Sequence, residues 1–160
     1  SDYLYLNLNY AKTDSALSAP TSTVFSISNS LTYSRSGEGK INYCFNEVEG
    51  FSRFGSYTGN GSTNGTFVFT GFRPAWVMIK ISSTTENWTI FDNKRSEFNL
   101  SQLGLYANSS SAEVTISTNG IDILSNGFKL RGNGSRTNQN NGTFIYLAFA
   151  ESPFKYARAR

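Results

Sequence analysis

The chain has 160 residues, of which 15% are aromatic and 16% are charged, and its formal net charge is +3. This length suits a single domain with a substantial core, and so high an aromatic content excludes an intrinsically disordered chain. The basic residues are scattered and no apolar run is long enough to cross a bilayer, so we predict neither nucleic-acid binding nor membrane insertion.

Two stretches near the N-terminus alternate apolar and polar side chains, which predicts half-buried strands, and a third is predicted to be a hydrophobic strand. The first is YLYLNLNY (residues 3–10), the second is TVFSIS (23–28), and the third is INYCFN (41–46). The third stretch carries the single cysteine, Cys44, which we interpret as a small buried side chain. One cysteine excludes an intrachain disulfide.

The middle of the chain contains the most apolar strand pattern. AWVMIKI (75–81) is apolar on both faces as far as Lys80, which predicts a central strand, and NWTIFD (87–92) is its expected hairpin partner. TFVFTGF (66–72) and AEVTIS (112–117) alternate and predict two further strands. Asn126-Gly127 predicts a tight hairpin turn within IDILSNGFKLR (121–131).

Helical signals are scarce. Only SEFNLSQLGLY (96–106) offers a possible helical turn, with Ser96 as its cap and Gly104 as its stop. Short strands separated by turn signals every ten or so residues predict an all-β fold. We therefore expect an antiparallel β-sandwich, jelly-roll-like, with at most one short helical turn.

Two segments resemble each other at a spacing of about one domain. INYCFNEVEGFSRFG (41–55) and FIYLAFAESPFKYAR (144–158) align at Tyr43 with Tyr146 and at Glu47 with Glu151. LYLNLNYAK (4–12) and LYANSSSAE (105–113) also match. We predict that residues 1–54 are the second half of a repeated unit and pack on a complete sandwich unit formed by residues 55–160. The alternatives are a missing half upstream or strands supplied by a neighbouring subunit.

The sequence contains no histidine, which excludes Ser-His-Asp and Cys-His catalysis and, with one cysteine, a structural zinc site. We predict no catalytic, cofactor-binding or metal-binding residues, and hence no enzyme. Glu47 and Glu151 could form a glycosidase pair, but ion pairs with Arg53 and Lys155 explain them better. Asp92 and Arg95 are interpreted as a structural pair that braces a turn.

Saccharide sites on sandwiches combine an aromatic platform with amide and hydroxyl groups. Trp88 with Asn87, and Tyr57 with Asn60, could provide such a platform, as could Asn138 and Asn140 in the SRTNQNNG loop. These are the candidate glycan-contact residues. The alternative is that Trp76 and Trp88 anchor the core; we favour it for both residues, and more strongly for Trp76.

Four blocks of sequence resemble a family common in marine bacteriophages, whose members are tail-fibre-like or other virion structural proteins. The blocks are GSYTGNGS (55–62), TGFRPAWVMIK (70–80), IDILSNGFKLR (121–131) and YLAFAESPFKYA (146–157). The resemblance implies a place on the surface of an extracellular virion, and it offers no catalytic residues to transfer.

The resemblance leads us to expect the C-terminal module of a tail fibre or comparable surface appendage, adhesive towards host-surface glycans. Identical weak sites would act together on a homo-oligomer, with a trimer favoured, and other virion proteins would be its partners. The alternatives are a purely architectural head or tail decoration without a host ligand, and a polysaccharide depolymerase.

Overall fold

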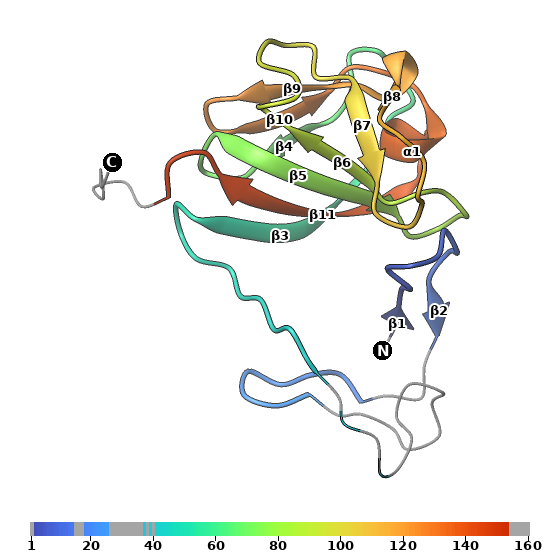
Figure 1. Cartoon of the computed structure of the whole chain (residues 1–160), viewed down its shortest axis with the longest axis vertical. Helices are drawn as coiled ribbons and strands as arrows, with labels where there is room; N and C mark the ends of the chain where they lie inside the picture. Colours follow the sequence, from blue (N-terminus) through green and yellow to red (C-terminus); the bar gives the residue numbers. More distant parts are fainter. Residues whose placement is uncertain (1, 15–17, 26–36, 38, 40, 154–160) are drawn as a thin grey trace.

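The computed structural model describes residues 2–14, 18–25, 37, 39 and 41–153. Within this part of the chain, two antiparallel sheets pack face to face, and the first two strands form a separate ribbon beside them (Figure 1). The predicted all-β sandwich is confirmed. The elements are β1 (Asp2–Tyr3), β2 (Thr13–Asp14), β3 (Ser52–Thr58), β4 (Phe67–Phe69), β5 (Pro74–Ile81), β6 (Thr89–Asp92), β7 (Leu103–Tyr106), β8 (Val114–Thr115), the 3-10 turn η1 (Ser117–Asn119), β9 (Ile121–Leu124), β10 (Gly127–Leu130), the helical turn α1 (Ser135–Asn138) and β11 (Thr143–Ala150).

The larger sheet has six strands in the order β3-β11-β5-β6-β7-β8 and the smaller has three in the order β4-β10-β9. β11 lies between β3 and β5 and pairs with both along almost its whole length. The longest strands thus form the middle of the larger sheet, where each has a neighbour for its backbone hydrogen bonds.

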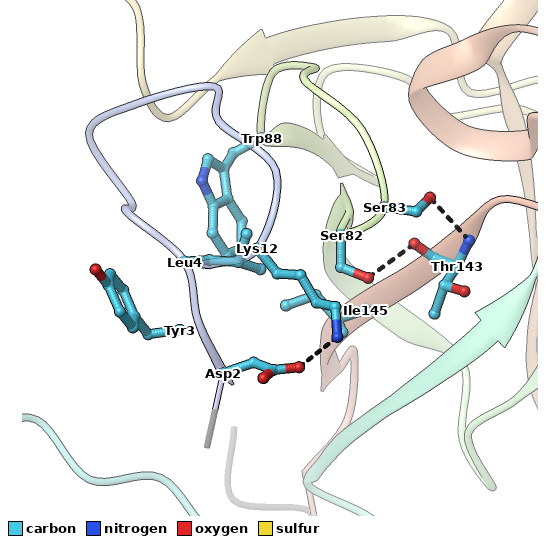
Figure 2. A pocket seen from close by; sticks show the side chains of 9 residues that line it. All are labelled: Asp2, Tyr3, Leu4, Lys12, Ser82, Ser83, Trp88, Thr143 and Ile145. Carbon is cyan, nitrogen blue, oxygen red and sulfur yellow. Dashed lines mark hydrogen bonds and ion pairs between the residues drawn. The ribbon is translucent and has the colours of Figure 1, made fainter. Parts of the chain in front are cut away.

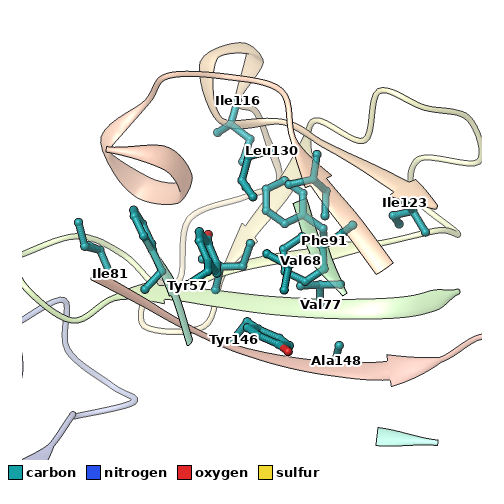
Figure 3. Packing of buried hydrophobic residues seen from close by; sticks show 14 of the residues in the cluster. Tyr57, Val68, Val77, Ile81, Phe91, Ile116, Ile123, Leu130, Tyr146 and Ala148 are labelled. Carbon is teal, nitrogen blue, oxygen red and sulfur yellow. The ribbon is translucent and has the colours of Figure 1, made fainter. Parts of the chain in front are cut away.

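The core fills the space between the two sheets, as Figure 3 shows. Alternate residues of each strand point into it, which is the period of two expected of a strand. Its members are mainly β-branched and aromatic: Val77, Ile79 and Ile81 on β5, Phe144, Tyr146 and Ala148 on β11, Ile121 and Ile123 on β9, and Phe128 and Leu130 on β10, with Tyr57, Val68, Phe72, Phe91 and Ile116 around them.

Several strand predictions are confirmed. The AWVMIKI stretch lies within β5, and NWTIFD supplies its antiparallel partner β6, with Met78 opposite Ile90. The predicted hairpin joins β9 and β10, but Ser125 and Asn126 form its turn, and Gly127 is the first residue of β10, opposite Leu124. Lys80 is fully buried on β5, and its amino group donates to the carbonyl oxygens of Ile81 and Thr84. Burial lowers the pKa of this amine to about 8.

The predicted helical turn within residues 96–106 is wrong. Residues 103–106 instead form β7, which pairs with β6 on one side and β8 on the other. Gly104 leaves room there for Ile116, because a Cβ atom would come within 2.6 Å of Ile116 Cδ1 and that side chain would have to move. Strand pairing on both sides therefore outweighs a weak local signal, and the helical turns lie at η1 and α1.

The N-terminal region contains less regular structure than predicted. Of the YLYLNLNY stretch only Tyr3 lies in a strand, residues 41–47 have no strand assignment, and Cys44 is exposed rather than buried. Residues 26–28 of TVFSIS lie outside the described residues. The reason is that these segments have no adjacent strand among the described residues, so their alternation is not matched by pairing.

The sandwich begins with β3 at Ser52, so the domain boundary predicted after residue 54 falls inside a strand. The two halves of the predicted repeat occupy different environments, because Tyr146 is buried in β11 whereas its counterpart Tyr43 is exposed. Among the described residues, no helix has both the length and the apolar character needed to span a membrane.

Candidate functional site

A pocket of about 560 Å³ lies between the N-terminal segment, residues 2–12, and one end of the larger sheet (Figure 2). One wall comes from the N-terminal segment and the other from β11 and the loop that joins β5 to β6. The lining residues are Asp2, Tyr3, Leu4, Lys12, Ser82, Ser83, Trp88, Thr143 and Ile145.

The N-terminal segment is held on the sandwich by three hydrogen bonds. The Trp88 indole Nε1 donates to the carbonyl oxygen of Tyr5 at 2.9 Å. The Lys12 N–H donates to the Ser82 carbonyl at 2.8 Å, and the Glu86 N–H donates to the Asn9 carbonyl at 2.9 Å. Two of the three are backbone–backbone bonds, so the segment is positioned largely independently of its side chains.

The sandwich wall of the pocket is rich in hydroxyl groups. The Ser82 hydroxyl donates to the carbonyl of Thr143 at 3.1 Å, and the Thr143 N–H donates to the Ser83 hydroxyl at 3.3 Å. Trp88 is buried and presents its ring to the pocket beside Leu4, as Figure 2 shows. The wall therefore offers both hydrogen-bonding groups and an apolar surface.

The mouth of the pocket carries one charge of each sign. The Lys12 amino group donates to the Asp2 carboxylate, and both side chains are about half exposed. The hydrogen bond from Lys12 holds the pKa of Asp2 below its usual range, and the same bond raises the pKa of Lys12. The pair is electrically neutral as a whole but still provides a donor and an acceptor at the rim.

Tyr57, one of the predicted glycan contacts, belongs to the core instead of the surface. Its ring stacks on Phe144 with centroids 4.9 Å apart, and its hydroxyl donates to the Thr137 carbonyl at 2.7 Å. Burial raises the pKa of this phenol well above its ordinary value. The ring faces are covered, so Tyr57 offers no platform for a sugar in this structure.

Asn60 and Asn138 come together at the end of the sandwich near α1, but as a structural clamp. Asn138 is fully buried, and its amide nitrogen donates to Asn60 Oδ1 and to the carbonyls of Ser62 and Gly132. The Asn60 N–H in turn donates to Asn138 Oδ1. Asn140, in the same loop, is exposed.

Asn87 and Trp88 lie together at the start of β6. Asn87 Oδ1 accepts from the Asn108 amide, and Asn108 Oδ1 accepts from the Trp88 N–H at 2.8 Å. Trp88 is thus the only member of the predicted glycan-contact set that lines the pocket. Trp76, predicted as a core anchor, instead lies half-buried on the outer face of the larger sheet against Phe149.

Sequence reasoning missed most of the pocket. Asp2, Tyr3 and Lys12 come from the start of the chain and Thr143 from near its end, so no local motif joins them. The only local signal is the change from an apolar run to hydroxyl residues at Ser82-Ser83. The pocket forms because segments that are distant in the sequence come together in the fold.

The acidic residues with candidate roles lie in separate ion pairs. Glu47 lies 3.4 Å from Arg53, as predicted, whereas Glu151 lies 2.7 Å from Arg73. Lys155, the predicted partner of Glu151, is outside the described residues.

The predicted turn-bracing pair is confirmed. Asp92 is bonded to the Arg95 guanidinium and accepts from the N–H groups of Lys94 and Arg95. These bonds lower the pKa of Asp92 despite the opposing effect of its partial burial. Within the described ranges, no cluster of three or more potential metal ligands occurs.

The fold and the pocket define a β-sandwich module whose N-terminal segment completes a surface site. The model of the family described as "Domain of unknown function (DUF7483)" matches residues 1–153, so the chain belongs to that family. Comparison with curated proteins and with solved structures gives no match.

Proposed function

We propose that this chain is a bacteriophage virion structural protein, the C-terminal module of a tail fibre or similar appendage, which binds host-surface glycans. The virion assignment rests on the four sequence blocks quoted above. The glycan assignment rests on one observation, the pocket beside Trp88, where an indole ring, hydroxyl groups and an ion pair surround about 560 Å³.

The chemistry of the pocket fits a saccharide. Sugar hydroxyls both donate and accept hydrogen bonds, and the rim offers the Asp2 carboxylate as an acceptor, Lys12 as a donor, and the Thr143 hydroxyl as either. The apolar face of a sugar ring can lie against Leu4 and Ile145 and against the small part of Trp88 that reaches the pocket. Because Trp88 is mostly covered, one site would bind weakly, and useful adhesion would need several sites on one oligomer.

Ligand-observed NMR of the 160-residue chain tests the site, with a panel of neutral hexoses and a uronic acid as probes. Lys12→Gln and Thr143→Val each remove a rim hydrogen bond and should weaken binding about 3- to 10-fold. Thr115→Val is the matched control, because Thr115 is an exposed strand threonine away from the pocket. Absence of saccharide binding, or equal binding by all three variants and wild type, would contradict the proposal.

Light scattering tests the multivalent part of the proposal. We expect the chain to form a stable trimer, which would present three pockets together. A folded monomer would contradict a trimer formed by this module alone and would leave oligomerisation to other parts of the particle.

One observation favours the alternative of an architectural decoration protein. Five aromatic side chains gather on the outer face of the larger sheet. This outer aromatic cluster consists of Phe45, Phe51, Phe54, Trp76 and Phe149, and two of its members, Phe45 and Phe51, are exposed. Contiguous exposed apolar patches mark protein-binding surfaces. A module that binds no saccharide but co-purifies with other virion proteins through this cluster would support the alternative.

A further inference from the structure

β3 forms one edge of the larger sheet, and Figure 1 shows it as the outermost strand there. In an antiparallel pair, the backbone groups of alternate residues point towards the neighbour or away from it. The backbone on either side of β3 fixes this alternation, because the Ala150 N–H donates to the Phe51 carbonyl and the Gly59 N–H donates to the Gly142 carbonyl. Odd-numbered residues of β3 therefore bond to β11.

Even-numbered residues of β3 face the opposite way, towards the free edge. The Ser52 N–H donates to the Val48 carbonyl at 2.9 Å, and the Phe54 N–H donates to the Glu47 carboxylate at 3.3 Å. The next residue in this series is Ser56. Among the described residues, no hydrogen bond is found for its outward-facing backbone N–H and carbonyl oxygen.

The segment just before β3 has the pattern of a strand but no strand partner among the described residues. Ile41, Tyr43 and Phe45 are 81%, 80% and 64% exposed, and they alternate with Asn42, Cys44 and Asn46. Such an alternating run predicts that one face should be buried. Exposure of all three apolar side chains leaves that face uncovered.

The turn between the two segments is already that of a hairpin. Val48 and Ser52 form an antiparallel bridge in which each N–H donates to the other's carbonyl, at 3.2 and 2.9 Å. Gly50 within the turn has a φ of 72°, a conformation that glycine adopts readily. The bridge therefore fixes the register in which residues 41–47 would continue along β3.

In that register, residues 41–47 would pair with the residues of β3 whose backbone groups face the free edge. Continuing from the Val48–Ser52 bridge, hydrogen-bonded pairs would form between Asn46 and Phe54, between Cys44 and Ser56, and between Asn42 and Thr58. These are the even-numbered residues of β3, whose backbone groups face outwards. The Thr58 carbonyl already accepts from the Thr66 hydroxyl at 2.8 Å, so pairing with Asn42 would share this acceptor or displace Thr66. Glu47 would lie opposite Arg53, and those two side chains are already 3.4 Å apart.

We propose that the free edge of β3 is a strand-binding site and that residues 41–47 of the same chain occupy it as an additional strand. Tyr43 would lie opposite Tyr57 and Phe45 opposite Gly55, so the apolar side chains would face the same side as the core residue Tyr57. Phe45 would leave the outer aromatic cluster. Pairing would also cover an edge that otherwise invites association with other chains.

The single native cysteine makes a direct test possible. Ser56→Cys places a second thiol opposite Cys44, where Cα atoms of a hydrogen-bonded pair are about 5.5 Å apart and a disulfide can form. Thr58→Cys is the matched control, on the same face of β3 but diagonal to Cys44, at about 7–8 Å. Each variant is oxidised mildly, and the products are separated by non-reducing electrophoresis and mass spectrometry.

We expect Ser56→Cys to form an intrachain disulfide about tenfold faster than Thr58→Cys, because only the first pair has a Cα spacing within the range found in disulfides. Adding Gly50→Val to Ser56→Cys should slow the reaction, since a β-branched residue is strained at positive φ. Equal rates for the two single variants would overturn the proposal. Predominant formation of disulfide-linked dimers by Ser56→Cys would overturn it too, by showing that a second copy supplies the strand.

Discussion

The sandwich and the chain before it use the same alternating pattern and reach different outcomes. On β5 and β11, alternate side chains enter a core shared by two sheets, and Phe144 is fully buried. In the described residues that precede β3, comparable alternating side chains such as Phe25 and Tyr43 stay exposed, and only two short strands form there. The comparison teaches that alternation produces a buried strand only where a neighbouring strand completes its hydrogen bonds.

The largest expected effect is a difference in stability when the same substitution, Phe to Ala, is made in each of the two regions. Phe144→Ala removes a fully buried ring that stacks on Tyr57 and should lower the free energy of unfolding by about 3–5 kcal/mol. Phe25→Ala, at a half-exposed ring, should change it by less than about 0.5 kcal/mol. Urea unfolding followed by tryptophan fluorescence measures the free energy of unfolding of both variants. Similar losses in the two variants would contradict the difference in packing between the two regions.

A smaller effect is expected where polar groups secure the end of the sandwich. Asn138→Ala should destabilise the protein by about 2–3 kcal/mol, because it leaves Asn60, Ser62 and Gly132 without their buried partner. Asn140→Ala, two residues later and exposed, should cost less than about 0.5 kcal/mol. Thermal unfolding of the pair distinguishes a structural clamp from a surface polar loop.

The buried amine of Lys80 predicts a pH dependence confined to the sandwich. Its pKa falls to about 8 in the folded state from 10.5, so between these values the unfolded chain holds more protons. The free energy of unfolding should therefore rise from pH 8 to about 9.5, by about 1–2 kcal/mol. Above about pH 10 the buried Tyr57 opposes this, since its raised pKa favours the unfolded state there.

Lys80→Met removes the titrating group and should abolish the rise in stability between pH 8 and 9.5. Urea unfolding at several pH values measures the effect, with Lys129→Met on the half-exposed face of β10 as the control. A rise that persists in Lys80→Met would show that another group causes it.

The smallest expected effect is weaker docking of the N-terminal segment on a sandwich that stays folded. Trp88→Phe removes the indole donor to Tyr5 and should weaken docking of residues 2–12 by about 1 kcal/mol. Hydrogen exchange of the Lys12 and Glu86 amides should then accelerate, whereas β5 and β11 amides should be unaffected. Trp76→Phe, on the outer face, should leave the Lys12 and Glu86 amides unchanged.

The sequence could predict those elements whose local pattern and spatial setting agree. The apolar run of β5, its hairpin partner β6 and the hairpin of β9 and β10 are such cases, because each depends on residues close together in the chain. β7 could not be predicted in this way. Its helical signals at Ser96 and Gly104 are local, whereas its strand conformation depends on β6 and β8.

The candidate site was less predictable than the fold. Composition could identify Trp88 as an aromatic residue next to amide groups, but it could not show that Asp2 and Lys12 close the pocket in front of it. Likewise, Tyr57 and Asn138 look like surface binding groups in a loop-rich sequence. Their burial results from packing against Phe144 and Asn60, which are distant along the chain.

The position of β11 has a consequence for synthesis on the ribosome. β11 is the last of the described strands in chain order, yet it separates β3 from β5 in the finished sheet. Until residues 143–150 emerge, the nascent chain carries two long strands that cannot reach their final partner. The larger sheet cannot be completed until β11 has been made, and β3 and β5 meanwhile lack the strand that lies between them, so this step of folding depends on contacts between residues far apart in the chain.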